Sequence, residues 1–140
     1  MIYLPDTNAW IVYLNVSASP VKRRFAAHSA SDIGVSTVVK AELFFGAHRS
    51  TRRAENLRTL ELLFQTFPSV PFDDAAAEHY GIIRSVLANQ GTPIGPNDLL
   101  IAATAVANNL VVVTHNTREF GRVPGLVVED WQEDASLKAP

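Results

Sequence analysis

Residues 99–114 constrain the fold more than any other part of the sequence. Residues 99–107 contain only Leu, Ile, Ala, Val and one Thr, and residues 110–114 read LVVVT. An almost wholly apolar helix has to be buried over most of its circumference. A continuous β-branched run is typical of a strand that is covered on both faces. The chain must therefore bury a helix and a central strand together.

Strand-like and helix-like segments alternate along the rest of the chain. Short apolar segments that suit strands lie at residues 1–4, 32–36, 69–73 and 125–131. Segments with helical periodicity lie at residues 7–14, 20–28, 37–48, 54–67 and 75–91, and a short helix is expected near 117–120. Strands separated by helices predict a parallel sheet with helices on both faces. We expect one three-layer α/β/α domain with a central, mainly parallel sheet over residues 1–131, followed by an acidic, frayed tail at residues 132–140.

Composition excludes several classes of protein. Apolar residues make up 47% of the 140 residues, so the chain can bury a core and is not of the disordered class. It has no cysteine, which excludes disulfides and thiolate metal sites. No apolar run reaches the ~20 residues of a membrane span, and the first ten residues lack a signal-peptide pattern. We expect a cytoplasmic protein that makes no membrane contact.

Charge is unevenly distributed along the chain. Residues 1–70 carry eight Lys/Arg and five Asp/Glu, whereas residues 71–140 carry four and nine, although the net charge is only −2. Basic residues gather in two clusters, which are Lys22, Arg23 and Arg24 in one and Arg49, Arg52 and Arg53 in the other. Each cluster could face a polyanion such as RNA or could be a solvated helix edge.

Three acidic residues occupy positions that solvent exposure does not readily explain. Asp6 directly follows the first strand, Glu42 lies in an otherwise apolar helix, and Asp98 opens the most apolar helix. Asp6 could simply cap the helix that starts near Thr7, and Asp98 or its neighbour Asn97 could cap the later one. Glu42 is either functional or part of a buried ion pair, because an unpaired carboxylate is costly to bury.

Taken together, these acids predict a site for a hard divalent cation. Mg²⁺ and Mn²⁺ prefer oxygen ligands, and three neighbouring carboxylates repel one another unless a cation is present. The absence of cysteine and the scatter of the four histidines, at positions 28, 48, 79 and 115, disfavour a zinc site. The residues alone predict an acidic metal pocket at the carboxyl edge of the sheet, where open α/β sheets bind ligands.

Four segments of the sequence resemble the PIN-domain ribonucleases of the VapC type, the toxins of toxin–antitoxin pairs. They are IYLPDTNAWIVYL, VSTVVKAELFFGA, PNDLLIAATAVANNLVVVTHNTREF and VPGLVVEDW, and they occur in the family's order over residues 1–131. The resemblance assigns Asp6, Glu42 and Asp98 to the catalytic and metal-binding acids, supported by Thr7 and Asn8. Asn116 occupies a fourth position that is Asp in many PIN domains, and Glu119 could supply the missing charge.

The resemblance also implies an activity and partners. It implies an endoribonuclease that uses Mg²⁺, with Mn²⁺ as a substitute, cleaves RNA (tRNA being the favoured class) and arrests translation and growth until a VapB-type antitoxin blocks it. Arg118 is a further candidate RNA contact, although it could equally be solvated. Apolar residues in excess of one small core point to a homodimer face or an antitoxin groove, although each taken singly could be a core residue, and they are Phe44, Phe45, Leu57, Leu60, Phe64 and Phe67.

Two other readings of the acidic residues remain open. An Asp-dependent phosphatase of the haloacid-dehalogenase type needs a second Asp two residues after the first, where this chain has Asn8. A non-catalytic RNA- or metal-binding module of the same fold is the other, and measured turnover separates it from an enzyme. His115, beside Asn116, is a candidate acid or base, an RNA contact or a bystander.

Overall fold

A parallel sheet forms the centre of the molecule. The computed structural model describes residues 1–132. Its strands are β1 (Tyr3–Pro5), β2 (Val35–Ser36), β3 (Ser69–Val70), β4 (Val111–Val113) and β5 (Val128–Glu129). They pair in the orders β1–β4–β5 and β2–β3, always in parallel. A bridge between Tyr3 and Ile33 connects the two groups of strands. The sheet is therefore parallel throughout the described residues, as the alternation of elements predicts.

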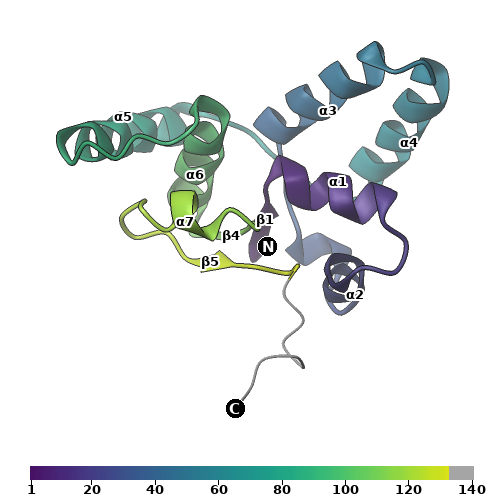
Figure 1. Cartoon of the computed structure of the whole chain (residues 1–140), viewed down its shortest axis with the longest axis horizontal. Coiled ribbons are helices and arrows are strands. Elements are labelled where there is room, and N and C mark those ends of the chain that lie inside the picture. Colours follow the sequence, from purple (N-terminus) through teal and green to yellow (C-terminus); the bar gives the residue numbers. More distant parts are fainter. Residues whose placement is uncertain (133–140) are drawn as a thin grey trace.

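Helices flank the sheet as two arms (Figure 1). They are α1 (Thr7–Asn15), α2 (Pro20–Ala26), α3 (Thr37–Arg49), α4 (Arg53–Thr66), α5 (Asp74–Asn89), α6 (Pro96–Asn108) and α7 (Thr117–Phe120), with a 3₁₀ turn at Ala30–Asp32. In Figure 1, α5 and α6 pack together on one side of β1 and β4, whereas α3 and α4 form a hairpin on the other. The side chains of Ser19 and Asp73 cap α2 and α5, because each accepts a hydrogen bond from an amide in the first turn of its helix.

The core is built around the apolar helix and strand on which the sequence argument rests. Along α6 the side chains of Ile101, Ala102 and Ala103 have no exposed surface, and Val112 of β4 has none either. A second group of core side chains surrounds Trp10 of α1. Its ring lies 4.9 Å from the ring centroids of both Phe25 and Phe67, in edge-on contacts that pack aromatic rings densely.

Several local expectations require correction. The first strand, expected at residues 1–4, runs instead from Tyr3 to Pro5, where Pro5 pairs with Val113 and Asp6 N donates the next hydrogen bond to Val113 O. Helix α6 begins at Pro96 with Gly95 as its N-cap residue, so neither Asn97 nor Asp98 caps it. Proline at the first helical position is a regular start signal, since it needs no hydrogen-bond acceptor there.

The apolar residues expected in excess of the core divide into two groups. Leu60 and Phe67 are buried core residues, and Leu57 and Phe64 are partly buried against the core. Phe45 is 65% exposed, and Phe44 is also exposed. Within residues 1–132, no helix is long and apolar enough to cross a membrane. Apart from Gln132, the expected tail lies outside the described residues, so the domain boundary at residue 131 stays a prediction.

Candidate active site

Two neighbouring strands deliver Asp6 and Thr114 to the same edge of the sheet. Each residue directly follows its strand, β1 or β4, and both are buried, Asp6 with 4% of its surface exposed. Asp6 Oδ1 accepts a hydrogen bond from Ala9 N at 2.9 Å, so the carboxylate caps α1. Asp6 Oδ2 accepts one from Thr114 Oγ1 at 2.6 Å. Asp6 is therefore both a helix cap and a fixed carboxylate at the carboxyl edge.

Helix α3 supplies the second acid. Glu42 is partly buried, and its Oε1 accepts a hydrogen bond from Thr7 Oγ1 at 2.8 Å. Its nearest basic neighbour in sequence, Lys40, lies over the ring of Phe64 at 4.7 Å from the ring centroid. No salt bridge to Glu42 is found among the described residues. The reading of Glu42 as half of a buried ion pair therefore finds no support, and the carboxylate is held by a hydroxyl instead.

Asp98 and Glu119 meet at the start of α6. Asp98 lies in the first turn of this helix, where the helix dipole favours a negative charge. Glu119 of α7 accepts hydrogen bonds from Gly95 N through Oε1 and, at 2.6 Å, from Asn116 Nδ2 through Oε2. A Cβ atom added to Gly95 would lie 3.4 Å from Glu119 Oε1 and 3.8 Å from Asp98 Oδ2. The two carboxylates therefore lie close together across Gly95.

Burial and neighbouring negative charges raise the pKa values of Asp98 and Asp6. Burial, followed by the negative charges of Glu119, Asp6 and Glu42, raises the pKa of Asp98 to about 6. Burial also raises the pKa of Asp6, to which the charges of Glu42 and Asp130 add, whereas the bonds from Thr114 and Ala9 oppose the rise. These mutual effects place the predicted acids in one electrostatic cluster with Glu119, which we call the acidic cluster (Asp6, Glu42, Asp98 and Glu119).

A cavity of about 410 Å³ opens beside Asp6. Its polar lining comprises Asp6, Asn8, His115, Asn116 and Gln132. His115 is largely exposed, and its Nδ1 lies 3.0 Å from Asp130 Oδ2. Asn116 N donates to Thr114 Oγ1 at 2.9 Å, so the loop after β4 is tied to the same hydroxyl that binds Asp6. The supporting residues predicted from sequence thus lie around the acidic cluster or its cavity.

The donor set suits a hard divalent cation. Among residues 1–132, no three carboxyl or imidazole groups converge as a preformed metal centre. Mg²⁺, however, usually takes only one or two protein carboxylates and keeps several waters. Each oxygen of Asp6 accepts one hydrogen bond from the protein and retains a second lone pair. Asp6 and Asp98 therefore fit a hard divalent cation such as Mg²⁺, whose charge would offset the burial and the mutual repulsion that raise their pKa values.

Sequence reasoning missed two residues of this site, Thr114 and Asp130. Thr114 fixes Asp6 across 108 residues of sequence, and Asp130 contacts His115 and adds to the charge around Asp6. Both residues immediately follow strands of the central sheet, β4 and β5. A residue directly after a parallel strand lies at the edge of the sheet where ligands bind. Asp6 was identified by this position, and Thr114 and Asp130 could have been identified in the same way.

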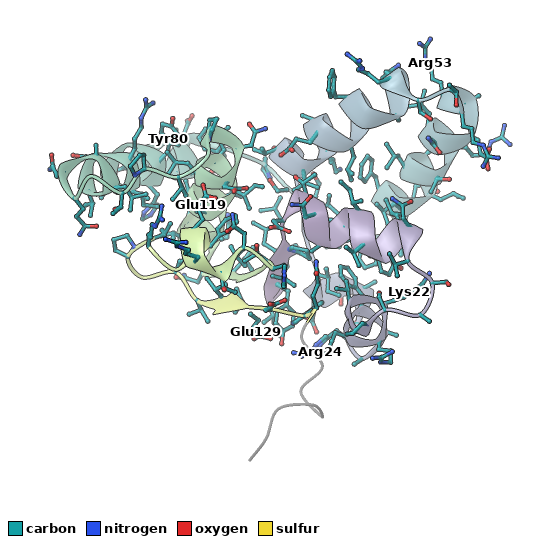
Figure 2. All side chains as sticks on the ribbon, viewed as in Figure 1. Lys22, Arg24, Arg53, Tyr80, Glu119 and Glu129 are labelled. Carbon is teal, nitrogen blue, oxygen red and sulfur yellow. The ribbon has the colours of Figure 1, made fainter. Side chains whose placement is uncertain are left out.

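In Figure 2 the labelled basic residues Lys22, Arg24 and Arg53 lie apart from the labelled Glu119 of the acidic cluster. Arg53 marks the far end of the α3–α4 hairpin, and Lys22 and Arg24 lie around α2, whereas Glu119 lies beside the start of α6. Arg24 forms a salt bridge with Glu129 at 3.3 Å, and Arg53 Nε donates to His48 O at 3.1 Å. The other predicted RNA contacts, Arg23, Arg49, Arg52 and Arg118, lie in α2, at the α3–α4 turn and in α7. A role for these residues in binding RNA stays a prediction.

Comparisons with known proteins identify the family of this chain. The PIN domain family model matches residues 3–126. The tRNA(fMet)-specific endonuclease VapC of Salmonella typhimurium is 38% identical over 92% of this chain and 97% of that protein. The protein of the same name from Shigella flexneri is 40% identical over the same shares. The DNA-bound VapBC structure from Salmonella typhimurium has a TM-score of 0.88 at 37% identity, covering 94% of this chain and 98% of that chain. VapBC-1 from nontypeable Haemophilus influenzae has a TM-score of 0.86 at 33% identity, covering 95% and 100%. The chain therefore belongs to the PIN-domain family and, within it, to the VapC proteins.

Proposed function

We propose that this chain is a Mg²⁺-dependent endoribonuclease, with Mn²⁺ as a substitute, that acts as the toxin of a toxin–antitoxin pair. One observation carries the assignment of the chemistry to the acidic cluster. Burial and then the charges of Glu119, Asp6 and Glu42 raise the pKa of Asp98, although these side chains come from α6, α7, the β1–α1 junction and α3. Carboxylates that repel one another beside an open cavity indicate a functional site, because a bound cation would neutralise them and could then hold an anionic substrate in the cavity.

Asp6 and Asp98 would hold the metal ion, with Glu42 binding it directly or through a water. When bound, such an ion lowers the pKa of a coordinated water and offsets negative charge on a phosphoryl group. Thr7 fixes the orientation of Glu42 through its hydroxyl. The free oxygen of Glu42 can then orient the attacking water and accept its proton. Thr114 and Ala9 hold Asp6 in a single orientation from two sides.

Hydrolysis by water determines the products. The water oxygen forms a bond to the RNA phosphorus, the bond from phosphorus to the ribose 3′-oxygen breaks, and a proton returns to that oxygen. The expected ends are therefore a 5′-phosphate and a 3′-hydroxyl. Attack by the ribose 2′-oxygen would instead leave a cyclic 2′,3′-phosphate and would not require the water that Glu42 is proposed to activate.

Transfer RNA is the substrate class that we propose. The similar proteins of Salmonella typhimurium and Shigella flexneri are both named as endonucleases specific for tRNA(fMet). The basic residues of α2 and of the α3–α4 turn then provide a surface for a folded polyanion beyond the cleavage site. Salt should weaken binding through those residues. A plot of log affinity against log salt concentration should have a slope of about −0.7 for each single-stranded phosphate that is neutralised.

The proposed protein partner is a VapB-type antitoxin. The solved VapBC structures from Salmonella typhimurium and Haemophilus influenzae are toxin–antitoxin relatives of this chain. A groove of about 350 Å³ between α1, α3 and α4 is lined by Leu14, Leu43, Leu60 and the acidic Glu42. An apolar segment that also carries a cation would fill this groove and neutralise Glu42. A homodimer stays a prediction, and the exposed Phe44 and Phe45 are available for it.

Cleavage of a tRNA pool and analysis of the product ends test this function. The purified chain, free of antitoxin, should cut tRNA in Mg²⁺ and leave 5′-phosphate ends that a 5′-phosphate-dependent exonuclease can degrade. Glu42→Gln keeps the size and the hydrogen-bond acceptor of the side chain but removes its charge, and it should lose activity without unfolding. Cyclic phosphate ends would refute the mechanism, and an inability to cut any RNA would favour a binding module.

A further inference from the structure

A second cavity lies on the other side of the loop that borders the acidic cluster. It has a volume of about 340 Å³ and lies between α5 and the start of α6. Its lining includes Tyr80, Arg84, Leu87, Ile94, Pro96 and Leu99. None of these residues takes part in the proposed hydrolysis. We call this cavity the Tyr80 pocket.

The Tyr80 pocket combines an aromatic ring with a guanidinium group and aliphatic walls. Tyr80 is partly exposed, and Arg84 is exposed one helical turn further along α5. Arg84 Nη1 donates to the Tyr80 hydroxyl at 3.0 Å, and the guanidinium carbon lies 5.9 Å from the ring centroid. Aromatic rings and guanidinium planes are the side-chain surfaces on which unpaired RNA bases stack. The aliphatic walls can contact the apolar face of a base that is not covered by the Tyr80 ring.

The loop at residues 93–96 connects this pocket directly to the acidic cluster. Gly95 N donates to Glu119, whereas Pro96 and Ile94, its two neighbours, line the Tyr80 pocket. Asp98 and the pocket residue Leu99 are adjacent in α6. Figure 2 shows the labelled Tyr80 and Glu119 on the same arm of the molecule, formed by α5, α6 and α7. A nucleotide in the pocket therefore lies beside a phosphate at the acidic cluster.

Charge favours a polyanion as the occupant over an apolar protein segment. Arg84 borders the pocket on α5, and Arg122 Nη1 donates to Pro93 O at 3.1 Å on the other side of the loop. The acidic cluster alone would repel RNA, so the strand requires cations close to the point of cleavage. A guanidinium group has five N–H donors, and Arg84 uses one of them for the Tyr80 hydroxyl. Its remaining N–H groups can therefore donate to a phosphate oxygen.

We infer that the Tyr80 pocket receives one unpaired base of the RNA next to the cleaved phosphodiester, with Arg84 contacting that nucleotide's phosphate. This inference rests on the proposed ribonuclease function and adds to it a specific subsite. It makes Tyr80 and Arg84 determinants of which single-stranded position is cut. Every base has a π face, so the pocket selects an unpaired nucleotide more strongly than a particular base.

An abasic scan of the RNA tests the inference. A series of single-stranded substrates is prepared, each lacking one base at a different position around the cleavage site. Each substrate is then cut with the wild-type chain and with Tyr80→Ala. For the wild type, removal of one particular base should lower kcat/KM by about 5- to 150-fold, the usual range for loss of one aromatic–base stack. Tyr80→Ala should lose a similar factor on the intact RNA and become insensitive to that same missing base.

Matched variants separate this outcome from a general defect. Ile82→Ala removes an exposed apolar side chain from the same helix and should keep the wild-type abasic profile. Tyr80→Phe keeps the ring and should retain the sensitivity, which preserves the test if Tyr80→Ala proves too unstable to fold. Arg84→Gln should reduce the slope of log affinity against log salt by about 0.7 for RNA bound in EDTA. Arg58→Gln, on the distant α4, should leave the slope unchanged.

Three results would overturn the inference. Equal abasic profiles for the wild type and Tyr80→Ala would show that no base occupies the pocket, while cleavage by the wild type would leave the proposed function intact. A change in sedimentation of Tyr80→Ala without RNA would assign the pocket to contact between two copies of the chain. A wild-type chain that cuts no RNA would refute the proposed function, and the subsite with it.

Discussion

Replacing Asp98 with Asn should stabilise the metal-free protein at neutral pH. The pKa of Asp98 is raised from 3.8 to about 6, chiefly by burial and by the charges of Glu119, Asp6 and Glu42. A shift of about two units corresponds to ~2.7 kcal/mol, at 1.36 kcal/mol per unit. Asp98 is only half-buried, so solvent screening reduces this to ~1.4 kcal/mol. The variant also loses the favourable interaction of the Asp98 charge with the helix dipole, which lowers the gain in stability by ~0.5 kcal/mol. The expected net gain is about 1 kcal/mol.

The pH dependence has a definite sign. The native state holds the Asp98 proton more tightly than the unfolded chain does, because its pKa in the folded protein is the higher one. The stability contributed by this proton is therefore fully present below the unfolded pKa of 3.8 and is lost as the pH rises through about 6. The amide of the Asp98→Asn variant cannot ionise, so the advantage of the variant should develop between these two values and be constant above them.

Thermal unfolding in EDTA at a series of pH values measures this effect. At pH 7.5 the variant should melt about 3–5 °C above the wild type, since 1 kcal/mol shifts Tm by roughly that amount in a chain of this size. Near pH 4 the difference should become small. Saturating Mg²⁺ should stabilise the wild type more than the variant, because the ion binds the folded state through Asp98. A variant that is less stable than the wild type in EDTA, or a difference that does not vary with pH, would refute the electrostatic account.

Three further changes test other parts of the structure. Thr7→Val should lower kcat about tenfold or more with little change in KM, because Glu42 loses its orienting hydroxyl; Thr7→Ser should restore the rate, and steady-state kinetics on tRNA will show whether it does. Thr114→Val removes the bond that lowers the pKa of Asp6, so the acid limb of the pH–rate profile should move to higher pH; an unmoved limb would contradict that role. Trp10→Ala should destabilise the fold by ~3–5 kcal/mol in urea unfolding, because it opens a cavity among Phe25 and Phe67; a loss below about 1 kcal/mol would show that the aromatic cluster can collapse.

Local chemistry made much of the fold predictable from sequence. The apolar segments that became α6 and β4 can be satisfied only by burial, and they form the centre of the core. Ser19 and Asp73 are typical of helix starts, because their side chains accept hydrogen bonds from backbone amides three residues further along the chain. The sequence offers Asp98 or Asn97 as a cap for α6, whereas the helix begins at Pro96 after Gly95. Proline restricts φ to helical values, so it was the stronger signal.

The site was predictable only in part, because its organisation depends on long-range contacts. The positions of Asp6, Glu42 and Asp98 were recognised from a family resemblance and from their apolar surroundings. The bond from Thr114 to Asp6 and the contact between His115 and Asp130 depend on how β1, β4 and β5 are ordered in the sheet. Sequence periodicity defines strands but not their order, so these partners could not be assigned. The Tyr80 pocket likewise exists only because α5 packs against the start of α6.

The rate of RNA hydrolysis by Asp98→Asn is the most direct test of the central claim, that the acidic cluster carries out metal-dependent cleavage. The variant is expected to be at least as stable as the wild type, so a loss of activity cannot be attributed to unfolding. We predict that the wild type cuts tRNA in Mg²⁺ and not in EDTA, and that the variant is slower by at least ~100-fold in Mg²⁺. Cleavage by the wild type that persists in EDTA, or a folded Asp98→Asn that cuts at the wild-type rate, would contradict the account.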